Sequence, residues 1–349
     1  MGRKSGIAII LVLSLVLSAA GCTKADAPAK NDSIKIGYIS ETFVIARWQR
    51  DRDAFTTRAK ALGAEVLVYN TYEDSEEQIQ VIDQLIQENV DVIVITPYDK
   101  DALTAVIKKA KDKGIKVIAY DRLIMNADID LYISFDNYAV GQLMAEKLLE
   151  VVPTGRYAII NGSPYDNNSN MLRDGYMDVL DAEVDAGRIE IVGPEFWADD
   201  WRSELAYEYT SNLLAAGEQI DAIIGANDLL AEGAITALSE NMLAGKVMVC
   251  GQDTELAACQ RIVEGTQYVS IYKPIPVLAE GAAEAAVMLA KGETVQTNDM
   301  ISNDMRMVPY LKYQPIAVTK ENMMDTVIDD GFHMMEEVYR NIPEENWPQ

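Results

Sequence analysis

Short apolar runs alternate with amphipathic stretches along most of the chain, and this pattern predicts strands that alternate with helices. In the first half, the expected strands are short and largely apolar, and they lie at residues 34–39, 65–69, 90–96 and 117–120. Residues 75–88 instead carry apolar side chains every three or four positions, which is typical of one face of a helix. Strands and helices at this spacing predict an α/β protein whose parallel sheet is covered on both faces.

The second half of the chain repeats this pattern. Residues 85–122 and 213–253 each run from a helix end through an aspartate, an apolar strand, a polar strand tip, a helix and a second strand that ends in aspartate. Because the two passages match in order and spacing, we interpret them as one structural unit that is used twice. This predicts two similar Rossmann-like lobes with parallel sheets, whose strand tips face a shared cleft.

The chain is expected to cross between these lobes three times, near residues 138, 274 and 307, in a three-strand hinge. The crossings define the expected domains, which are an N-terminal lobe of residues 34–138 plus 274–306, a C-terminal lobe of residues 139–273 plus 307–333, and a C-terminal tail of residues 334–349. Each lobe is therefore expected to be discontinuous in sequence.

The N-terminus predicts an export signal rather than a part of the fold. A basic pair precedes an apolar run at residues 7–17, and small residues then lead to Cys22. The sequence Ala-Ala-Gly-Cys is similar to the processing site of bacterial lipoproteins, which predicts a lipoprotein signal peptide over residues 1–21, a lipid on Cys22 and a flexible tether over residues 22–33. A plain secretory signal that contains a cysteine is the alternative. In either case we expect an extracytoplasmic protein, and in the first case one that is lipid-anchored to a bacterial membrane.

The composition restricts the choice of partners. The chain of 349 residues carries a formal net charge of −25 at pH 7. A strongly acidic protein repels nucleic acids and polyanionic substrates, so the charge argues against both. Apart from Cys22, the cysteines are Cys250, at the end of an expected strand, and Cys259, on the helix that follows. Two buried free thiols and a disulfide are both compatible with the sequence.

Motifs that would support catalysis are missing from the sequence. The chain has one histidine, His333, which lies away from every strand tip, and it contains neither a G-x-S-x-G elbow nor a phosphate-binding loop. It also has no Cys/His cluster for zinc and no calcium-binding loop. Loop carboxylates such as Asp199 and Asp200 are expected to be solvated rather than to hydrolyse glycosides. We therefore expect a protein without enzymatic activity, cofactor or bound metal.

Polar residues collect where the expected strands end. Asp121 and Arg122 follow residues 117–120, and ligands of open parallel α/β sheets bind at the carboxyl ends of strands. Because an acid accepts hydrogen bonds and an arginine donates them in a planar fork, the pair suits a small neutral ligand with many hydroxyls. A surface ion pair between the two is the alternative. Other strand ends and loops supply similar residues, which are Arg47, Trp48, Asp166, Asn168, Trp201, Asn227, Asp253 and Lys273. Either tryptophan can cover a sugar ring or pack in the core.

Six segments carry a resemblance to a known family, and they read ARWQRDRDAF, AYDRLIMNADIDLYISFDN, NGSPYDNN, GANDLLAEGAI, GQDTELAACQRIVEGTQYVSIYKPI and DTVIDDGFH. Over residues 34–333 the chain resembles the periplasmic sugar-binding proteins of ABC importers, most strongly the members that bind D-xylose. The resemblance implies a type I periplasmic binding fold with two lobes and a hinge. It also implies that the polar strand-end residues named above contact a pentose, and that Trp48 and Trp201 flank its ring. The loop GPEFWADDW ends at Trp201, and the part before this tryptophan is one residue longer than in the family pattern.

The resemblance also implies partners. It implies a monomer that captures one monosaccharide, with D-xylose as the expected sugar, and delivers it to the membrane subunits of an ABC permease. A protein that docks on a chemoreceptor or a sensor kinase, or that binds another pentose or a hexose, would use the same kind of site and is the alternative. The sequence leaves open the anomer, the affinity and the role of the tail.

Overall fold

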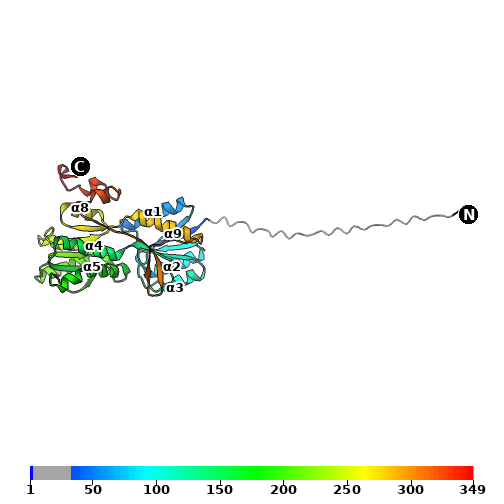
Figure 1. Ribbon diagram of the computed structural model, residues 1–349, viewed down its shortest axis with the longest axis horizontal. Helices are drawn as coiled ribbons and strands as arrows, with labels where there is room; N and C mark the ends of the chain where they lie inside the picture. The colour runs from blue at the N-terminus through cyan, green and yellow to red at the C-terminus, as the bar shows by residue number, and fades with distance from the viewer. Residues whose placement is uncertain (3–32, 349) are drawn as a thin grey trace. The chain divides into compact units, whose positions relative to one another are not determined.

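The computed structural model describes residues 1–2 and 33–348, so Cys22 and most of the expected signal peptide and tether lie outside the described residues. From Ser33 onward the chain forms two α/β lobes, each built around its own sheet (Figure 1). This confirms the two-lobe α/β fold predicted from the sequence. Among the described residues, none of the helices has both the length and the apolar character needed to span a membrane.

The first lobe contains a seven-stranded sheet in the order β12-β13-β5-β4-β3-β1-β2. Neighbouring strands are parallel except β12 and β13, which form an antiparallel pair at one edge. The strands are β1 (Lys35–Ser40), β2 (Glu65–Asn70), β3 (Val92–Ile95), β4 (Lys116–Tyr120), β5 (Leu131–Phe135), β12 (Asp299–Ser302) and β13 (Met307–Tyr313).

Helices cover both faces of this sheet because its strands are apolar on both sides. In β3, Val92 and Val94 point into the core shared with α1 and α9, whereas Ile93 and Ile95 point into the core shared with α2 and α3. The strand therefore reads as an uninterrupted apolar run rather than an alternating one. The covering helices are α1 (Ala46–Ala61), α2 (Ser75–Gln87), α3 (Thr104–Asp112) and α9 (Ile275–Ala290).

The second lobe repeats this design with the sheet order β14-β11-β10-β9-β6-β7, and β8 also pairs with β6. Cys250 in β10 and Cys259 in α8 are both buried and free, so these two thiols form no disulfide. The strands are β6 (Gly155–Asn161), β7 (Ile189–Ile191), β8 (Phe196–Trp197), β9 (Ala222–Gly225), β10 (Met248–Gln252), β11 (Val269–Tyr272) and β14 (Ile316–Val318). The helices are α4 (Asn137–Val151), α5 (Asn167–Asp185), η1 (Asp199–Trp201), α6 (Ser203–Ala215), α7 (Asp228–Glu240) and α8 (Leu256–Glu264).

One expected crossing between the lobes is wrong. The sequence pattern predicts a crossing near residue 307, but β13 pairs with β5 in the first sheet, with Tyr310 opposite Tyr132. Tyr310 is also buried in the core of the first lobe. The chain crosses instead between Tyr313 and Ile316, where β14 begins to pair with β11 in the second sheet. An extended apolar segment does not indicate by itself which of two sheets it joins, because its partners are distant in sequence.

The C-terminal segment, residues 334–348, packs on the second lobe. It contains the short helix α10 (Met335–Val338), which contacts α8. Tyr339 and Trp347 join Cys259 in a small apolar cluster. The segment is therefore part of the folded lobe, and it comes shortly after a π-helical turn, η2 (Met324–Ile328).

Candidate functional site

A cavity between the two lobes gathers the polar residues of the strand ends, and all ten side chains singled out from the sequence line it. The first lobe contributes Arg47 and Trp48 from α1 and the pair Asp121 and Arg122 from the end of β4. The second lobe contributes residues from the start of α5, from η1 and from just after β9, β10 and β11, which are Asp166, Asn168, Trp201, Asn227, Asp253 and Lys273. These residues are distant in sequence and meet because the carboxyl ends of both sheets face the cavity.

Two residues of the second lobe also begin helices. The side chain of Asp166 accepts a hydrogen bond from the Asn168 backbone N–H at 2.8 Å, which caps α5. Asn227 Oδ1 accepts one from the Leu230 N–H at 2.9 Å, which caps α7. The helix α5 therefore begins at Asn167, directly after its capping residue. Asp166 and Asn227 are thus held by the helices that they cap.

Arg122 lies between two buried carboxylates from opposite lobes. Its Nη1 donates to Glu41, which follows β1, and its Nε lies 2.7 Å from Asp166 Oδ2 in the second lobe. The alternative of a surface ion pair between Asp121 and Arg122 is wrong. Asp121 adopts a left-handed conformation, with a φ of 61°, and its carboxylate pairs with Arg47 instead.

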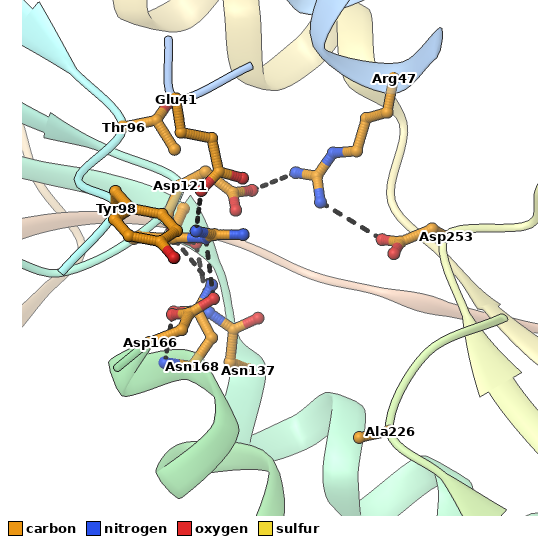
Figure 2. Close-up of polar contacts among 12 residues, drawn as sticks. Glu41, Arg47, Thr96, Tyr98, Asp121, Asn137, Asp166, Asn168, Ala226 and Asp253 are labelled. Atoms are coloured by element: carbon orange, nitrogen blue, oxygen red, sulfur yellow. Dashed lines mark hydrogen bonds and ion pairs between the residues drawn. The ribbon is translucent and has the colours of Figure 1, made fainter. Parts of the chain in front are cut away.

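Arg47 forms a second bridge between the lobes. It donates to Asp121 in the first lobe and, through Nη1 at 3.2 Å, to Asp253 Oδ1 in the second (Figure 2). Lys273 Nζ lies 2.7 Å from the same Asp253 oxygen. Burial alone would raise the pKa of Asp253, but Lys273 and Arg47 together hold it below its ordinary value. Asp253 is therefore ionised at neutral pH and can accept hydrogen bonds from a ligand.

Two further buried carboxyls lie next to the arginines. Burial raises the pKa of Glu41 to about 7, against the opposing effect of Arg122. Behind Arg47, Asp51 accepts a hydrogen bond from the Tyr120 hydroxyl, and its other oxygen lies 3.8 Å from Arg47 Nε. Burial likewise raises the pKa of Asp51 to about 7, against the effects of Arg47 and Tyr120. Both carboxyls therefore change their charge near neutral pH.

The two tryptophans supply flat apolar surfaces to the cavity. Trp48 is almost fully buried, and the guanidinium carbon of Arg47 lies 4.5 Å from its ring centroid. Trp201 is partly buried and approaches Gly162 so closely that a Cβ there would lie 2.2 Å from the indole. Only glycine at position 162 therefore leaves room for this ring. Two indoles beside hydrogen-bonding groups can cover the C–H face of a ring while the polar residues reach its hydroxyls.

Contacts between the lobes also close the rim of the cavity. The Tyr98 hydroxyl donates to Asp200 Oδ1 at 2.6 Å. Beside it, Lys100 Nζ donates to the Pro164 carbonyl at 3.0 Å, and the Lys100 backbone N–H donates to the Tyr165 carbonyl at 3.0 Å. Since Tyr98 and Lys100 follow β3 while their partners follow β6 and β8, the lobes are in contact at the rim as well as inside.

The cavity has further lining residues that the sequence pattern did not single out, and these are Glu41, Ile45, Glu73, Tyr98, Ser163, Asp200, Leu229, Gln252 and Glu255. Glu41 directly follows β1 and Gln252 ends β10. A search for polar residues at the end of every expected strand would have found both. Glu73 and Glu255 lie in loops without a local signal, so only their spatial position reveals them.

A two-lobe α/β fold that encloses a polar cavity at facing strand ends is typical of proteins that bind one small solute between their lobes. Comparison with protein families agrees with this class. The chain belongs to the periplasmic binding protein family, since the model described as the periplasmic binding protein domain matches residues 36–294.

Relatives match the chain over nearly its whole length. The D-xylose-binding periplasmic protein of Escherichia coli is 45% identical over 333 residues, which cover 95% of this chain and 98% of that protein. The D-xylose-binding periplasmic protein of Haemophilus influenzae is 44% identical over 330 residues, which cover 94% and 99% respectively. Among solved structures, a carbohydrate transporter solute-binding protein from Chloroflexus aurantiacus, in complex with D-glucose, has a TM-score of 0.82 at 24% identity and covers 88% of this chain and 98% of that chain. That likeness confirms the fold.

Proposed function

We propose that this protein captures D-xylose outside the cytoplasmic membrane and delivers it to the membrane subunits of an ABC permease. The observation that carries the proposal is the cavity, since ten side chains chosen from the sequence for binding a polyhydroxy ring all line it. Both relatives named in the preceding subsection are D-xylose-binding periplasmic proteins. A pentose is neutral, so the acidic charge of the chain does not oppose its binding.

Recognition would depend on directional hydrogen bonds. Arg122 uses Nη1 for Glu41 and Nε for Asp166, which leaves other N–H groups of its fork for sugar oxygens. Asp253 offers carboxylate oxygens to sugar hydroxyls, and the Asn227 amide can both donate and accept. A hydrogen bond to a charged group contributes roughly 1.5–3 kcal/mol, so an analogue that lacks one hydroxyl should bind much more weakly.

Calorimetric titration of the purified protein with a panel of pentoses and hexoses tests the ligand. D-xylose should give a saturable heat with one site per chain and the highest affinity of the panel. Arg58→Ala, which changes an exposed arginine paired with Glu284 on the surface of the first lobe, is a control that should bind like the wild type. Tighter binding of a hexose would show that the hexose, and not D-xylose, is the ligand. The absence of binding to every sugar would reject the proposal.

Binding should also change the separation of the lobes. The interlobe contacts of Arg47, Arg122 and Tyr98 need the lobes to be closed, and a ligand that spans both lobes would favour that state. Small-angle scattering should therefore give a smaller radius of gyration with saturating D-xylose than without it. Identical curves would count against ligand-driven closure.

We further propose that a lipid on Cys22 anchors the protein to the membrane. The support is the sequence alone, since a basic and apolar leader precedes this cysteine. Expressed with its own leader in a bacterium, the protein should fractionate with membranes, whereas Cys22→Ser should be released or remain unprocessed. Equal solubility of the two forms would favour a plain secretory signal.

Sensing is the second candidate for the biological output of sugar binding. A binding protein that docks on a chemoreceptor or a sensor kinase would need the same cavity, so the cavity does not separate the two outputs. Uptake of labelled xylose into cells that carry or lack the gene does separate them. Unchanged uptake together with a lost response to xylose would favour sensing.

A further inference from the structure

The turn that carries Asp253 has an unusual backbone conformation. Asp253 has a φ of 91° and Thr254 a φ of 48°, both in the left-handed region that favours glycine. A β-branched residue such as threonine rarely adopts this conformation unless its surroundings hold it there. The position of the Asp253 carboxylate in the cavity therefore depends on the contacts that fix this turn.

Hydrogen bonds hold the N–H groups of the turn. The Thr254 N–H donates to Ser270 Oγ at 3.0 Å, and the Glu255 N–H donates to Asp228 Oδ2 at 3.1 Å. Ser270 Oγ in turn donates to the same Asp228 oxygen at 2.8 Å, so one buried carboxyl secures both groups. The Thr254 carbonyl belongs to the same peptide unit as the Glu255 N–H and points the opposite way. It needs a partner on the other side.

That partner is His333, which lies 79 residues further along the chain. The expectation that this histidine lies away from every strand tip is therefore wrong, because β10 ends at Gln252, two residues before Thr254. Its Nε2 is 2.8 Å from the Thr254 carbonyl oxygen, and its ring is buried. Because a carbonyl oxygen can only accept, Nε2 carries the proton in this contact. Cys259 Sγ also approaches the oxygen, at 3.4 Å, but a thiol is a weak donor. His333 is therefore the strong donor that completes the turn.

The segment that carries His333 also contacts the first lobe. The Phe332 ring lies with its centroid 4.6 Å from that of His333. Arg50 on α1 donates through Nη1 to the Phe332 carbonyl at 3.0 Å, and its guanidinium carbon lies 4.4 Å from the Phe332 ring centroid. Arg50 comes about one helical turn after Arg47, and Arg47 pairs with Asp253. Residues 332–333 therefore contact both the helix that carries Arg47 and the turn that carries its partner.

We propose that His333 is a positioning residue of the ligand site: its Nε2–H holds the Thr254 carbonyl and thereby directs the Asp253 carboxylate towards Arg47, Lys273 and the bound sugar. The role in ligand binding rests on the proposed function, whereas the contact with Thr254 does not. Since His333 is not among the residues that line the cavity, its effect on the sugar is indirect, and its direct hydrogen bond to Thr254 assigns that effect to the turn.

The wild-type chain allows a first test, in a form without an affinity tag. Labelling with ¹⁵N-histidine gives signals from one ring, because the sequence contains one histidine. NMR should show the Nε2–H tautomer, a ring N–H that exchanges slowly with water, and ring signals that shift when D-xylose saturates the protein. An Nδ1–H tautomer, or ring signals that do not respond to a sugar that binds, would overturn the proposal.

Variants provide the second test. Well below the melting temperature, His333→Ala should weaken D-xylose binding about five- to thirtyfold, because a lost hydrogen bond of this kind changes binding by roughly 1–2 kcal/mol. His333→Gln, whose amide N–H can reach the place of Nε2, should recover most of the affinity. Met334→Ala changes the exposed neighbouring residue and is the matched control that should bind like the wild type.

A double-mutant cycle distinguishes positioning from a purely structural role. In an Asp253→Asn background, His333→Ala should cost clearly less affinity than in the wild type, because both changes act on the same carboxylate. Full additivity, or a lower melting temperature with unchanged affinity, would overturn the proposal.

If the wild type binds no sugar, the proposed function fails. If the wild type and His333→Ala bind equally well, only the positioning role fails. Should His333→Ala not fold, His333→Gln and the NMR test still decide.

Discussion

Arg122 in the first lobe and Asn227 in the second both line the cavity, but different forces hold them in place. Arg122 has a long side chain, and its end is fixed by the carboxylates of Glu41 and Asp166. Asn227 has a short side chain, which is fixed because its oxygen caps α7. The arginines of the first lobe, Arg47 and Arg122, are thus held by ion pairs, whereas Asn227 of the second lobe is held by the backbone of the helix that it caps.

This difference indicates how the effect of a substitution spreads. In the first lobe, the loss of one charge leaves its partners unpaired, some of them in the opposite lobe. In the second lobe, the loss of a cap weakens one helix end. Substitutions in the two lobes should therefore produce distinguishable patterns of sugar affinity and stability, and single substitutions at four positions can test that contrast.

The largest effect is expected from Arg122→Ala. Removing the guanidinium leaves sugar oxygens and Glu41 without a donor and Asp166 without its cation, and affinity for the sugar should fall about ten- to several-hundredfold. Arg122→Lys should recover only part of this, because one ammonium cannot reproduce the fork. Calorimetry measures both, with Arg58→Ala as the surface control. Near-wild-type affinity in Arg122→Ala would show that this residue does not bind the sugar.

Asn227→Ala should have the next largest effect and should show the behaviour of the second lobe. Loss of the amide should weaken sugar binding about ten- to fiftyfold, since it both donates and accepts. Loss of the cap of α7 should also lower the free energy of unfolding by about 1 kcal/mol. Asn227→Ser keeps a capping oxygen but has a shorter reach, so it should restore stability without restoring affinity. Denaturant titration and calorimetry on both variants check this, and parallel recovery of both properties would contradict it.

Glu41 should give the first lobe a dependence of stability on pH. Burial raises the pKa of Glu41 to about 7 from its ordinary value of 4.5. Between these values the folded protein binds a proton that the unfolded chain does not, so this group makes the protein less stable as the pH rises through the window. Glu41→Gln lacks this proton equilibrium. Its free energy of unfolding, relative to the wild type, should rise by roughly 1–3 kcal/mol between pH 4.5 and 7.5. A pH-independent difference would contradict the assignment.

The smallest effect is expected at the rim. Tyr98→Phe removes the hydroxyl that joins the first lobe to Asp200 in the second. An exposed hydrogen bond contributes roughly 0.5–1 kcal/mol, so the sugar should dissociate about two- to fivefold faster. Stopped-flow fluorescence of the cavity tryptophans measures this rate. Tyr165→Phe removes an exposed hydroxyl from the same rim. This hydroxyl takes no part in the contact with Asp200, so the variant should leave the dissociation rate unchanged. Equal rates for the two variants would show that the contact does not retain the ligand.

The alternation of strands and helices, and the polar residues at the strand ends, were predictable because both patterns are local. An apolar run of four or five residues followed by an acid is readable without any knowledge of its partners, as at Asp121. The general geometry of parallel sheets then places such residues on one edge. This reasoning, with the family resemblance, led to ten residues that the structure places around one cavity.

The pairing of these residues was decided by the tertiary structure. Glu41 and Arg122 are separated by 81 positions, and Asp121, whose backbone is left-handed, pairs with Arg47 rather than with its neighbour Arg122. Similarly, β13 joins the first sheet because its partner β5 lies there, and His333 reaches Thr254 across 79 positions. Hydrophobic periodicity is set by neighbours along the chain, and so the sequence by itself determined the elements and their polar ends. Ion pairs, sheet partners and strained turns depend on groups that only folding brings together, so the tertiary structure alone decided which side chain holds which.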